Sequence, residues 1–186
     1  MDRLRNYTAV LSRWNKAINL VGRADATQIW TRHVADCLRL APLVPPGTLA
    51  ATDLGSGAGL PGLVLAITTG VPFALVEADQ RKAAFLLEAA RITGAPVTVH
   101  PVRIEAARLD PAPLVTARAL APLALLLDYA APLLARGGVA LFPKGAGADA
   151  EIADARAQGW RFSVERHDDP ASPASTILRL SDIGRG

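Results

Sequence analysis

DLGSGAGLPG, residues 53–62, carries four glycines in ten positions and decides how the fold is understood. Counted from Gly57, the stretch spells G-x-G-x-x-G, the fingerprint of a dinucleotide-binding turn. Counted from Asp53, it spells acid-x-Gly-x-Gly-x-Gly, the pattern of an S-adenosylmethionine loop. The two patterns end the preceding strand at different residues, so the strand itself can distinguish them.

Apolar runs on both sides of this stretch predict an α/β fold. Short runs typical of strands alternate with helical segments, the strands at 48–54, 72–78, 96–101, 114–119 and 137–143 and the helices after Leu60, Arg81, Pro122 and Ala148. Such alternation indicates a mostly parallel sheet with helices on both faces. Beyond Gly159 two strands follow each other and predict an antiparallel hairpin. We therefore expect a Rossmann-like, mostly parallel sheet of seven strands.

The strand before the glycines favours the S-adenosylmethionine pattern. If Gly57 opened the turn, a buried parallel strand would end in Asp53 and two small residues, although such strands are almost continuously apolar. If Gly55 opens the turn, Asp53 stands at the carboxyl tip of the strand. A carboxylate there suits a cationic ligand, directly or through water, and S-adenosylmethionine carries an ammonium and a sulfonium group.

The next strand ends in VEAD, residues 76–79. Glu77 stands where a carboxylate would accept hydrogen bonds from both ribose hydroxyls of either cofactor. A structural alternative is that Glu77 and Asp79 only begin the following helix, beside its positive end. Glu77 therefore predicts nucleotide binding without choosing between the cofactors.

Residues 1–47 predict a helical cap in front of an α/β core at 48–186. Apolar side chains recur every three or four positions from Leu4 to Ile18, as in an amphipathic helix. A second helix is expected from Thr27, as its N-cap, to about Leu40, with inward-facing Ile29, Val34, Cys37 and Ala41. A chain of 186 residues fits a single domain.

The net charge of +3 is concentrated at the N-terminal end. The first forty residues hold seven bases and three acids, a balance of +4, and the rest hold thirteen bases and fourteen acids, a balance of −1. Such a segment suits a polyanionic partner, although a solvated helix accounts for the charge equally well.

The composition disfavours several classes of protein. The N-terminus lacks the apolar centre of a secretory signal, and no apolar run reaches the roughly 20 residues of a membrane span, so we expect a cytoplasmic protein without a membrane partner. Cys37 is the single cysteine and the three histidines are scattered, so neither a disulfide nor a bound metal is expected.

The fourth strand ends in TARALAP, residues 116–122. It contains neither an N/D-P-P-aromatic tetrad for an exocyclic amine nor a Pro-Cys nucleophile for a pyrimidine carbon. Cys37 lies in the cap, and such a cysteine is more often a small buried residue than a nucleophile. An acceptor atom that is already nucleophilic and loses no proton would need neither device, and guanine N7 is such an atom.

Motifs along nearly the whole chain resemble the bacterial small-subunit rRNA guanine-N7 methyltransferases, the RsmG or GidB family. The matching stretches are Y-x-x-x-L-x-x-WNKAINL at 7–20, RHVADCL at 32–38, DLGSGAGLPG at 53–62, LVEADQRKAAFL at 75–86, RIE at 103–105, TARALAPL at 116–123 and PKG at 143–145. Many methyltransferases share the glycine loop, whereas this series of motifs in this order is specific.

The resemblance implies a class I methyltransferase fold with an N-terminal helical cap, S-adenosylmethionine as cofactor, and one guanine in the decoding-region loop of 16S rRNA, in the small ribosomal subunit, as substrate. We also expect a monomer. Together with the glycine pattern it implies cofactor contacts at Asp53, Gly55, Gly57, Gly59, Leu60, Glu77, Ala78, Asp79, Ile104, Glu105 and Arg118. Contacts with RNA are expected at Arg13, Lys16, Arg23, Arg32, His33 and Lys144.

Arg118 is also the expected catalytic residue, because a guanidinium offers a planar fork of donors that can orient the guanine or the cofactor carboxylate. A structural alternative is an ion pair of Arg118 with Asp53 or Glu105. His33 and Asp36 lie one helical turn apart, either as a buried pair or as a cap contact with the cofactor.

Two other functions remain open from the residues alone. An NAD-dependent oxidoreductase would use the G-x-G-x-x-G pattern, against which Asp53 argues. A catalytically silent RNA-binding or ribosome-assembly protein would keep the fold without the reaction.

Overall fold

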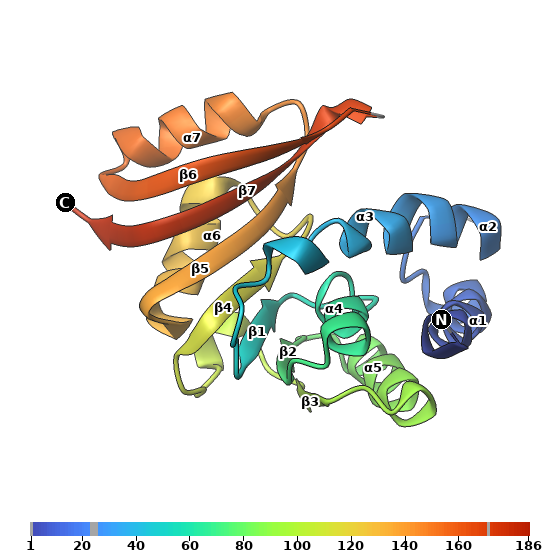
Figure 1. Ribbon diagram of the computed structural model, residues 1–186. Helices are drawn as coiled ribbons and strands as arrows, with labels where there is room; N and C mark the ends of the chain where they lie inside the picture. The colour runs from blue at the N-terminus through green and yellow to red at the C-terminus, as the bar shows by residue number, and fades with distance from the viewer. Residues whose placement is uncertain (1, 23–25, 171) are drawn as a thin grey trace.

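Seven strands form one twisted sheet in the computed structural model, which describes residues 2–22, 26–170 and 172–186 (Figure 1). The strands are β1 Ala51–Leu54, β2 Phe73–Val76, β3 Val97–His100, β4 Ala112–Ala117, β5 Leu134–Lys144, β6 Trp160–Asp169 and β7 Ser172–Arg185. Their order is β3-β2-β1-β4-β5-β7-β6, with β7 antiparallel to both of its neighbours. The predicted parallel sheet with a closing hairpin is thereby confirmed.

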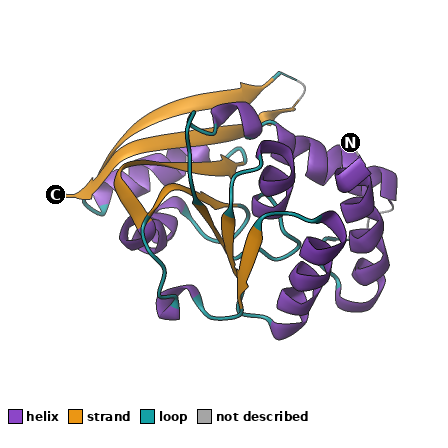
Figure 2. Ribbon diagram, turned by 60° about the horizontal axis from the view of Figure 1, so that its bottom comes forward, coloured by secondary structure: helices purple, strands orange, loops and turns teal. Residues whose placement is uncertain are grey.

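Helices cover both faces of the sheet (Figure 2). Those of the α/β core are α4 Gly62–Thr69, α5 Gln80–Thr93, α6 Leu123–Ala130 and α7 Ala148–Ala157, with short 3-10 turns η3 Ile104–Ala106 and η4 Ala131–Leu133. Those of the cap are α1 Asp2–Ile18, α2 Ala26–Ile29, the π turn η1 Trp30–Val34, α3 Ala35–Leu38 and the 3-10 turn η2 Ala41–Leu43. Among the described residues, no helix is long and apolar enough to cross a membrane.

The strands divide their side chains between two hydrophobic clusters, because successive residues of a strand point to opposite faces. Leu114 of β4 packs with the cap, α4 and α5, whereas its neighbour Val115 packs with α6 and α7. The first cluster also contains Leu4, Tyr7 and Leu11 of α1. The cap therefore shares a continuous core with the sheet.

The second cap helix differs from the expected one. It was expected to run from Thr27 as N-cap to about Leu40, but it begins at Ala26, and the π turn η1 interrupts it. Single π turns within helices occur frequently at functional sites, and this one carries His33. Among the residues expected to face inward, the buried ones are Ile29, Val34 and Cys37 and the half-buried one is Ala41.

Strand ends also shift from the expected positions. β1 begins at Ala51 rather than 48, because Thr48 donates its hydroxyl to the Pro45 carbonyl in a turn and Leu49 is 83% exposed. At the other end of the chain, β6 and β7 extend into the segment that was expected to connect them, up to Asp169 and from Ser172.

The sheet order reverses between β1 and β4, which lie side by side although β2 follows β1 in the sequence. In open α/β sheets, ligands bind at the carboxyl ends of the strands where the order reverses. The loops after β1, β2 and β4 therefore mark the position of the candidate site.

Candidate active site

The glycine loop starts where the S-adenosylmethionine pattern predicts. β1 ends at Leu54, and Gly55 opens the turn with a φ of 63°, a left-handed conformation that favours glycine. A Cβ on Gly55 would lie 2.7 Å from the Leu120 side chain. The loop can therefore follow this path only because Gly55 has no side chain.

Asp53 lies beneath this loop and is completely buried. Its Oδ1 accepts a hydrogen bond of 2.6 Å from the Thr116 hydroxyl, and burial raises the pKa of the carboxyl group to about 6. A Cβ on Gly62 would lie 2.5 Å from the Asp53 Cβ, so the last glycine of the G-x-G-x-x-G pattern lets α4 pack against β1. Asp53 lines none of the cavities described below, and the structure gives it a supporting position beneath the loop. The expected contact of Asp53 with the cofactor, directly or through water, stays a prediction.

A first cavity of about 340 Å³ lies between the glycine loop and the end of β2, and we call it the Glu77 cavity. Residues expected to bind the cofactor that line it are Gly55, Gly57, Glu77, Ala78, Ile104 and Glu105. The Glu77 carboxylate is held in place from both sides, because Oε2 accepts from the Gly57 amide at 2.7 Å and Oε1 from the Asp79 amide at 2.8 Å. Each oxygen retains a lone pair for a ribose hydroxyl.

Asp79 has a different position from the one expected. Its side chain caps α5, with Oδ1 accepting from the backbone amides of Arg81 at 2.8 Å and Lys82 at 3.2 Å. These hydrogen bonds lower the pKa of the Asp79 carboxyl. Asp79 does not line the Glu77 cavity, so the helix-capping alternative accounts for Asp79 and not for Glu77.

A second cavity of about 260 Å³, the Leu60 cavity, lies on the cap side of the same loop. Gly55 and Gly57 line it as well, together with Leu60, His33 and Arg118. Gly59 lines neither of these two cavities. A Cβ there would lie 2.8 Å from the Leu63 Cβ, so its absence permits packing inside the protein.

Arg118 follows β4 and is held by the cap. Its Nη2 lies 3.1 Å from His33 Nδ1 and 3.4 Å from Asp36 Oδ2, and its Nη1 donates to the His33 carbonyl at 3.3 Å. The suggested structural pairing with Asp53 or Glu105 is wrong, because the carboxylate that pairs with Arg118 is Asp36. Burial and the Arg118 charge lower the pKa of His33, which favours a neutral imidazole beside the guanidinium.

A third cavity of about 530 Å³, the Lys144 cavity, opens on the other side of Arg118. Its polar lining residues are Asp36, Arg39, Arg118, Lys144, Glu151 and Ser175. Arg118 also lines the Leu60 cavity, and Ala119 lines all three cavities. Ala119 has a φ of 52°, an uncommon conformation for alanine and one that recurs at functional sites.

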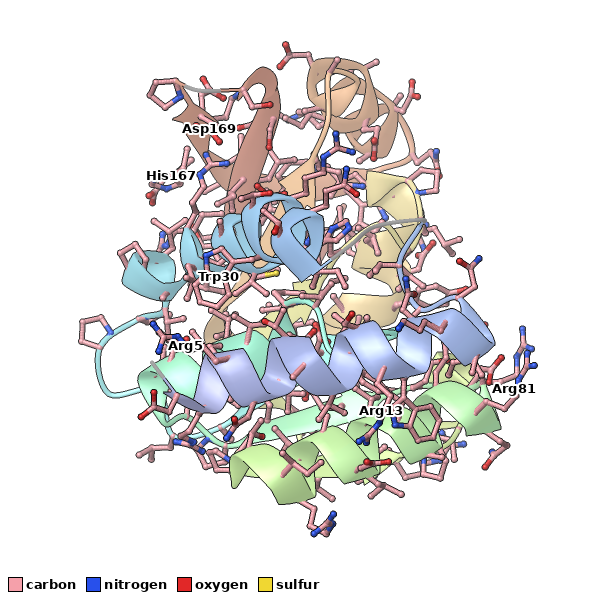
Figure 3. All side chains as sticks on the ribbon, turned by 90° about the vertical axis from the view of Figure 1, so that its right-hand side faces the viewer. Arg5, Arg13, Trp30, Arg81, His167 and Asp169 are labelled. Carbon is pink, nitrogen blue, oxygen red and sulfur yellow. The ribbon has the colours of Figure 1, made fainter. Side chains whose placement is uncertain are left out.

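The residues expected to contact RNA lie in different surroundings. Arg13 forms an ion pair with Glu88 of α5, and Figure 3 shows its side chain directed from α1 toward that helix. Lys16 and Arg32 are exposed, and His33 is half-buried beside Arg118. The Lys144 side chain is only 8% exposed. Arg23 lies outside the described residues.

Several lining residues were missed. Lys82 lines both the Glu77 and Leu60 cavities, and its place in the first turn of α5, five residues after Glu77, could have indicated it. Tyr129 lines the Glu77 cavity from α6 and donates to Glu105 Oε1 at 3.2 Å, a contact for which the sequence gives no signal. Glu151 of α7 lines the Lys144 cavity and was likewise missed.

Cys37 is unsuited to nucleophilic attack. The residue is completely buried, and burial raises the pKa of its thiol to about 12. The thiolate is the nucleophilic form of cysteine, so covalent catalysis by Cys37 is disfavoured. Among the described residues, no group of three or more His, Cys, Asp and Glu side chains is placed to hold a metal ion.

The residues around the glycine loop fit S-adenosylmethionine. A fixed carboxylate at Glu77 faces a cavity of suitable position for a ribose, and Gly55 permits close approach of a ligand to the backbone. A solved structure of similar fold, the magnesium protoporphyrin IX methyltransferase of Synechocystis with bound cofactor, has a TM-score of 0.64, 12% identity and coverage of 94% of this chain and 96% of that one. The fold and the site define a class I S-adenosylmethionine-dependent methyltransferase.

Comparison of the sequence narrows the class to a family. Residues 1–168 match the family described as rRNA small subunit methyltransferase G, GidB. Relatives named ribosomal RNA small subunit methyltransferase G include those of Acidiphilium cryptum, 54% identical over 98% of this chain and 85% of that protein, and Rhodospirillum centenum, 53% identical over 98% and 84%. The chain belongs to this family, as the motifs predicted, and the oxidoreductase alternative is wrong.

Proposed function

We propose that the protein transfers a methyl group from S-adenosylmethionine to N7 of one guanine in the decoding-region loop of 16S rRNA. The observation that carries the proposal is the Lys144 cavity, which meets the cofactor side of the site at Arg118 and Ala119. A flipped-out base in that cavity would lie next to the cofactor, as in other enzymes that modify bases. The names of the relatives support rRNA of the small subunit as the substrate.

The chemistry of N7 methylation agrees with the groups in the site. Bound S-adenosylmethionine would supply an electrophilic methyl group. The N7 lone pair of guanine would accept the methyl carbon, the sulfur would keep the electron pair of the broken bond as a neutral thioether, and the positive charge would pass to the purine. No proton leaves the acceptor atom, so no general base is required. The contribution of the protein is alignment and exclusion of water, which can supply about 7–11 kcal/mol.

Arg118 is our candidate for this alignment. Its guanidinium lies between the Leu60 and Lys144 cavities, and its fork of donors is fixed by His33 and Asp36. From this position Arg118 can donate to the cofactor carboxylate on one side or to a purine on the other. The cap therefore takes part in the reaction by orienting this residue.

Contact with RNA phosphates is assigned to two of the exposed basic residues of the cap, Lys16 and Arg32. Arg13 is a weaker candidate for phosphate contact because it is paired with Glu88. Lys144 is also a weaker candidate, because its side chain is largely buried. Neutralisation of phosphates by such residues predicts that RNA affinity falls steeply with salt. Binding that is unchanged between about 50 and 200 mM salt would exclude this arrangement.

The test is methyl transfer from labelled S-adenosylmethionine to 16S rRNA or small subunits, with the modified atom mapped by primer extension and mass spectrometry. At saturating cofactor, Arg118→Ala should lower kcat at least about tenfold, because one oriented donor set is lost at the reacting centre. Arg179→Ala removes an arginine that pairs with Glu165 on the hairpin and does not line any of the three cavities, so it should retain the wild-type kcat.

Two results would contradict the proposal. An Arg118→Ala enzyme with the wild-type rate would remove Arg118 from the reaction. If 16S rRNA from cells without the gene contains as much 7-methylguanosine as 16S rRNA from wild-type cells, the assigned guanine is not the target of this enzyme. Titration with S-adenosylmethionine separates a silent RNA-binding protein, which need not bind the cofactor.

A further inference from the structure

The Lys144 cavity contains a lysine and a glutamate in a fixed arrangement. Lys144 Nζ donates to Glu151 Oε2 at 2.6 Å and to the Ala121 carbonyl at 2.9 Å. Oε2 of Glu151 also accepts from the Leu123 amide at 2.7 Å. The pair therefore joins the end of β5, the start of α6 and the first turn of α7 on one side of the cavity.

Both partners line the cavity, and each retains hydrogen-bonding capacity. An ammonium group has three donors, and two of those on Lys144 are used. In the part of the chain that the structure describes, no donor within hydrogen-bonding distance of Glu151 Oε1 is found, and the Glu151 side chain is 29% exposed. The same cavity is also lined by Asp36, Arg39 and Arg118. At the pair itself, the cavity wall thus presents one cationic donor, Lys144, beside one anionic acceptor, Glu151.

This order of groups matches one edge of guanine. On the Watson–Crick edge, guanine presents the O6 acceptor next to the N1–H and N2 amine donors, whereas adenine presents an N6 amine donor next to the N1 acceptor. O6 also lies beside N7 on the Hoogsteen edge of guanine. A guanine whose N7 faces the cofactor side at Ala119 would direct O6 and N1 further into the same cavity.

We propose that Lys144 and Glu151 select guanine as the acceptor base, with Lys144 donating to O6 and Glu151 Oε1 accepting from N1–H and the N2 amine. The inference rests on the proposed function and names its specificity-determining residues. Adenine would bring its amine to the ammonium and its N1 lone pair to the carboxylate, and both contacts are repulsive. Sequence-specific recognition of single-stranded RNA uses hydrogen bonds to the Watson–Crick and Hoogsteen edges of the bases.

The experiment compares two acceptors, small subunits reconstituted with guanine or with 2,6-diaminopurine at the target nucleotide. Diaminopurine keeps N7 and the N2 amine but replaces O6 and N1–H by an amine and a lone pair. The wild-type kcat/KM should be at least about 100-fold higher for guanine, since two hydrogen-bonding groups are mismatched in diaminopurine. In Glu151→Gln the side-chain amide can donate to the diaminopurine N1, so this ratio should fall at least about tenfold.

The ratio of kcat/KM for guanine to kcat/KM for diaminopurine distinguishes recognition of the base by Glu151 from a purely structural role of this residue. If Glu151 only holds Lys144 and α6, Glu151→Gln will lower kcat/KM for both acceptors in proportion, and the unchanged ratio overturns the inference. Glu165→Gln replaces a hairpin carboxylate paired with Arg179 and should keep the wild-type ratio.

If Glu151→Gln does not fold, the wild-type enzyme alone can still refute the inference. Equal use of the two bases by the wild type overturns the inference, whereas strong preference for guanine supports it. A wild-type enzyme that methylates guanine at N7 but does not discriminate leaves the proposed function standing without this inference. A wild-type enzyme that does not methylate N7 refutes both.

Discussion

Replacement of Asp53 by asparagine should change how the stability of the protein depends on pH. The Asp53 carboxyl is buried under the glycine loop, and burial raises its pKa from 3.8 to about 6. The folded state therefore binds a proton more tightly than the unfolded state, so this residue favours folding at low pH and the advantage is lost as the pH rises through about 6.

The size of the effect follows from the two pKa values. At 1.36 kcal/mol for each pKa unit, the titration of Asp53 lowers the free energy of unfolding of the wild type by about 3 kcal/mol between low pH, where the carboxyl is protonated, and high pH, where it is ionised. About 2 kcal/mol of this loss falls between about pH 4.5 and pH 7.5. Asparagine has similar shape and does not titrate. The free energy of unfolding of Asp53→Asn, minus that of the wild type, should therefore rise by about 2 kcal/mol over this interval.

Urea denaturation at a series of pH values measures this difference, with equal m-values as the check that both proteins unfold alike. Asp110→Asn, which removes an exposed carboxylate, is the matched control for the loss of one acidic side chain. A constant difference for Asp53→Asn would show that burial does not destabilise the ionised carboxylate, and the supporting role assigned to Asp53 would then need another basis.

Three other changes test the packing around the site. Gly62→Ala places a Cβ 2.5 Å from the Asp53 Cβ and should cost about 1–3 kcal/mol in urea denaturation, and an unchanged midpoint would contradict the close packing. Tyr7→Phe removes a buried hydrogen bond of 2.6 Å to the Ala58 carbonyl and should lower the free energy of unfolding by about 1–2 kcal/mol. It should also lower the affinity for the cofactor measured by calorimetry, and an unchanged affinity would show that the loop keeps its shape without this hydrogen bond. Glu88→Gln weakens a partly exposed ion pair and should cost less than about 1 kcal/mol.

Much of the fold follows from local patterns. Alternating apolar runs and helical segments predicted the parallel sheet, and the composition of the strand before Gly55 predicted where the loop begins. The second cap helix was not predicted correctly. Its π turn lies where Arg118, eighty-five residues away from His33, contacts the helix, and a local pattern contains no information about such a distant contact.

The place of some candidate site residues in the fold could be predicted from their position at the end of a strand. Glu77 follows a parallel strand and faces the cavity, as its position indicated. Asp53 also stands near a strand end, but the alternation of side chains along a strand does not show which helices cover each face of the sheet. The burial of Asp53 under α4 was therefore not predicted. Tyr129 and Glu151 come from α6 and α7, whose approach to the cavities depends on packing of the whole domain.

The hydrogen bond from Tyr7 to Ala58 joins the first helix of the chain to the loop that approaches the cofactor. α1 also contributes Leu4 and Leu11 to the core that it shares with the sheet. The cap, to which contacts with RNA are assigned under the proposed function, and the loop at the cofactor side are therefore not separable modules in this molecule. A chimera that receives the cap of another methyltransferase would have to inherit this tyrosine, or an equivalent support for the loop, before its altered target preference could be observed.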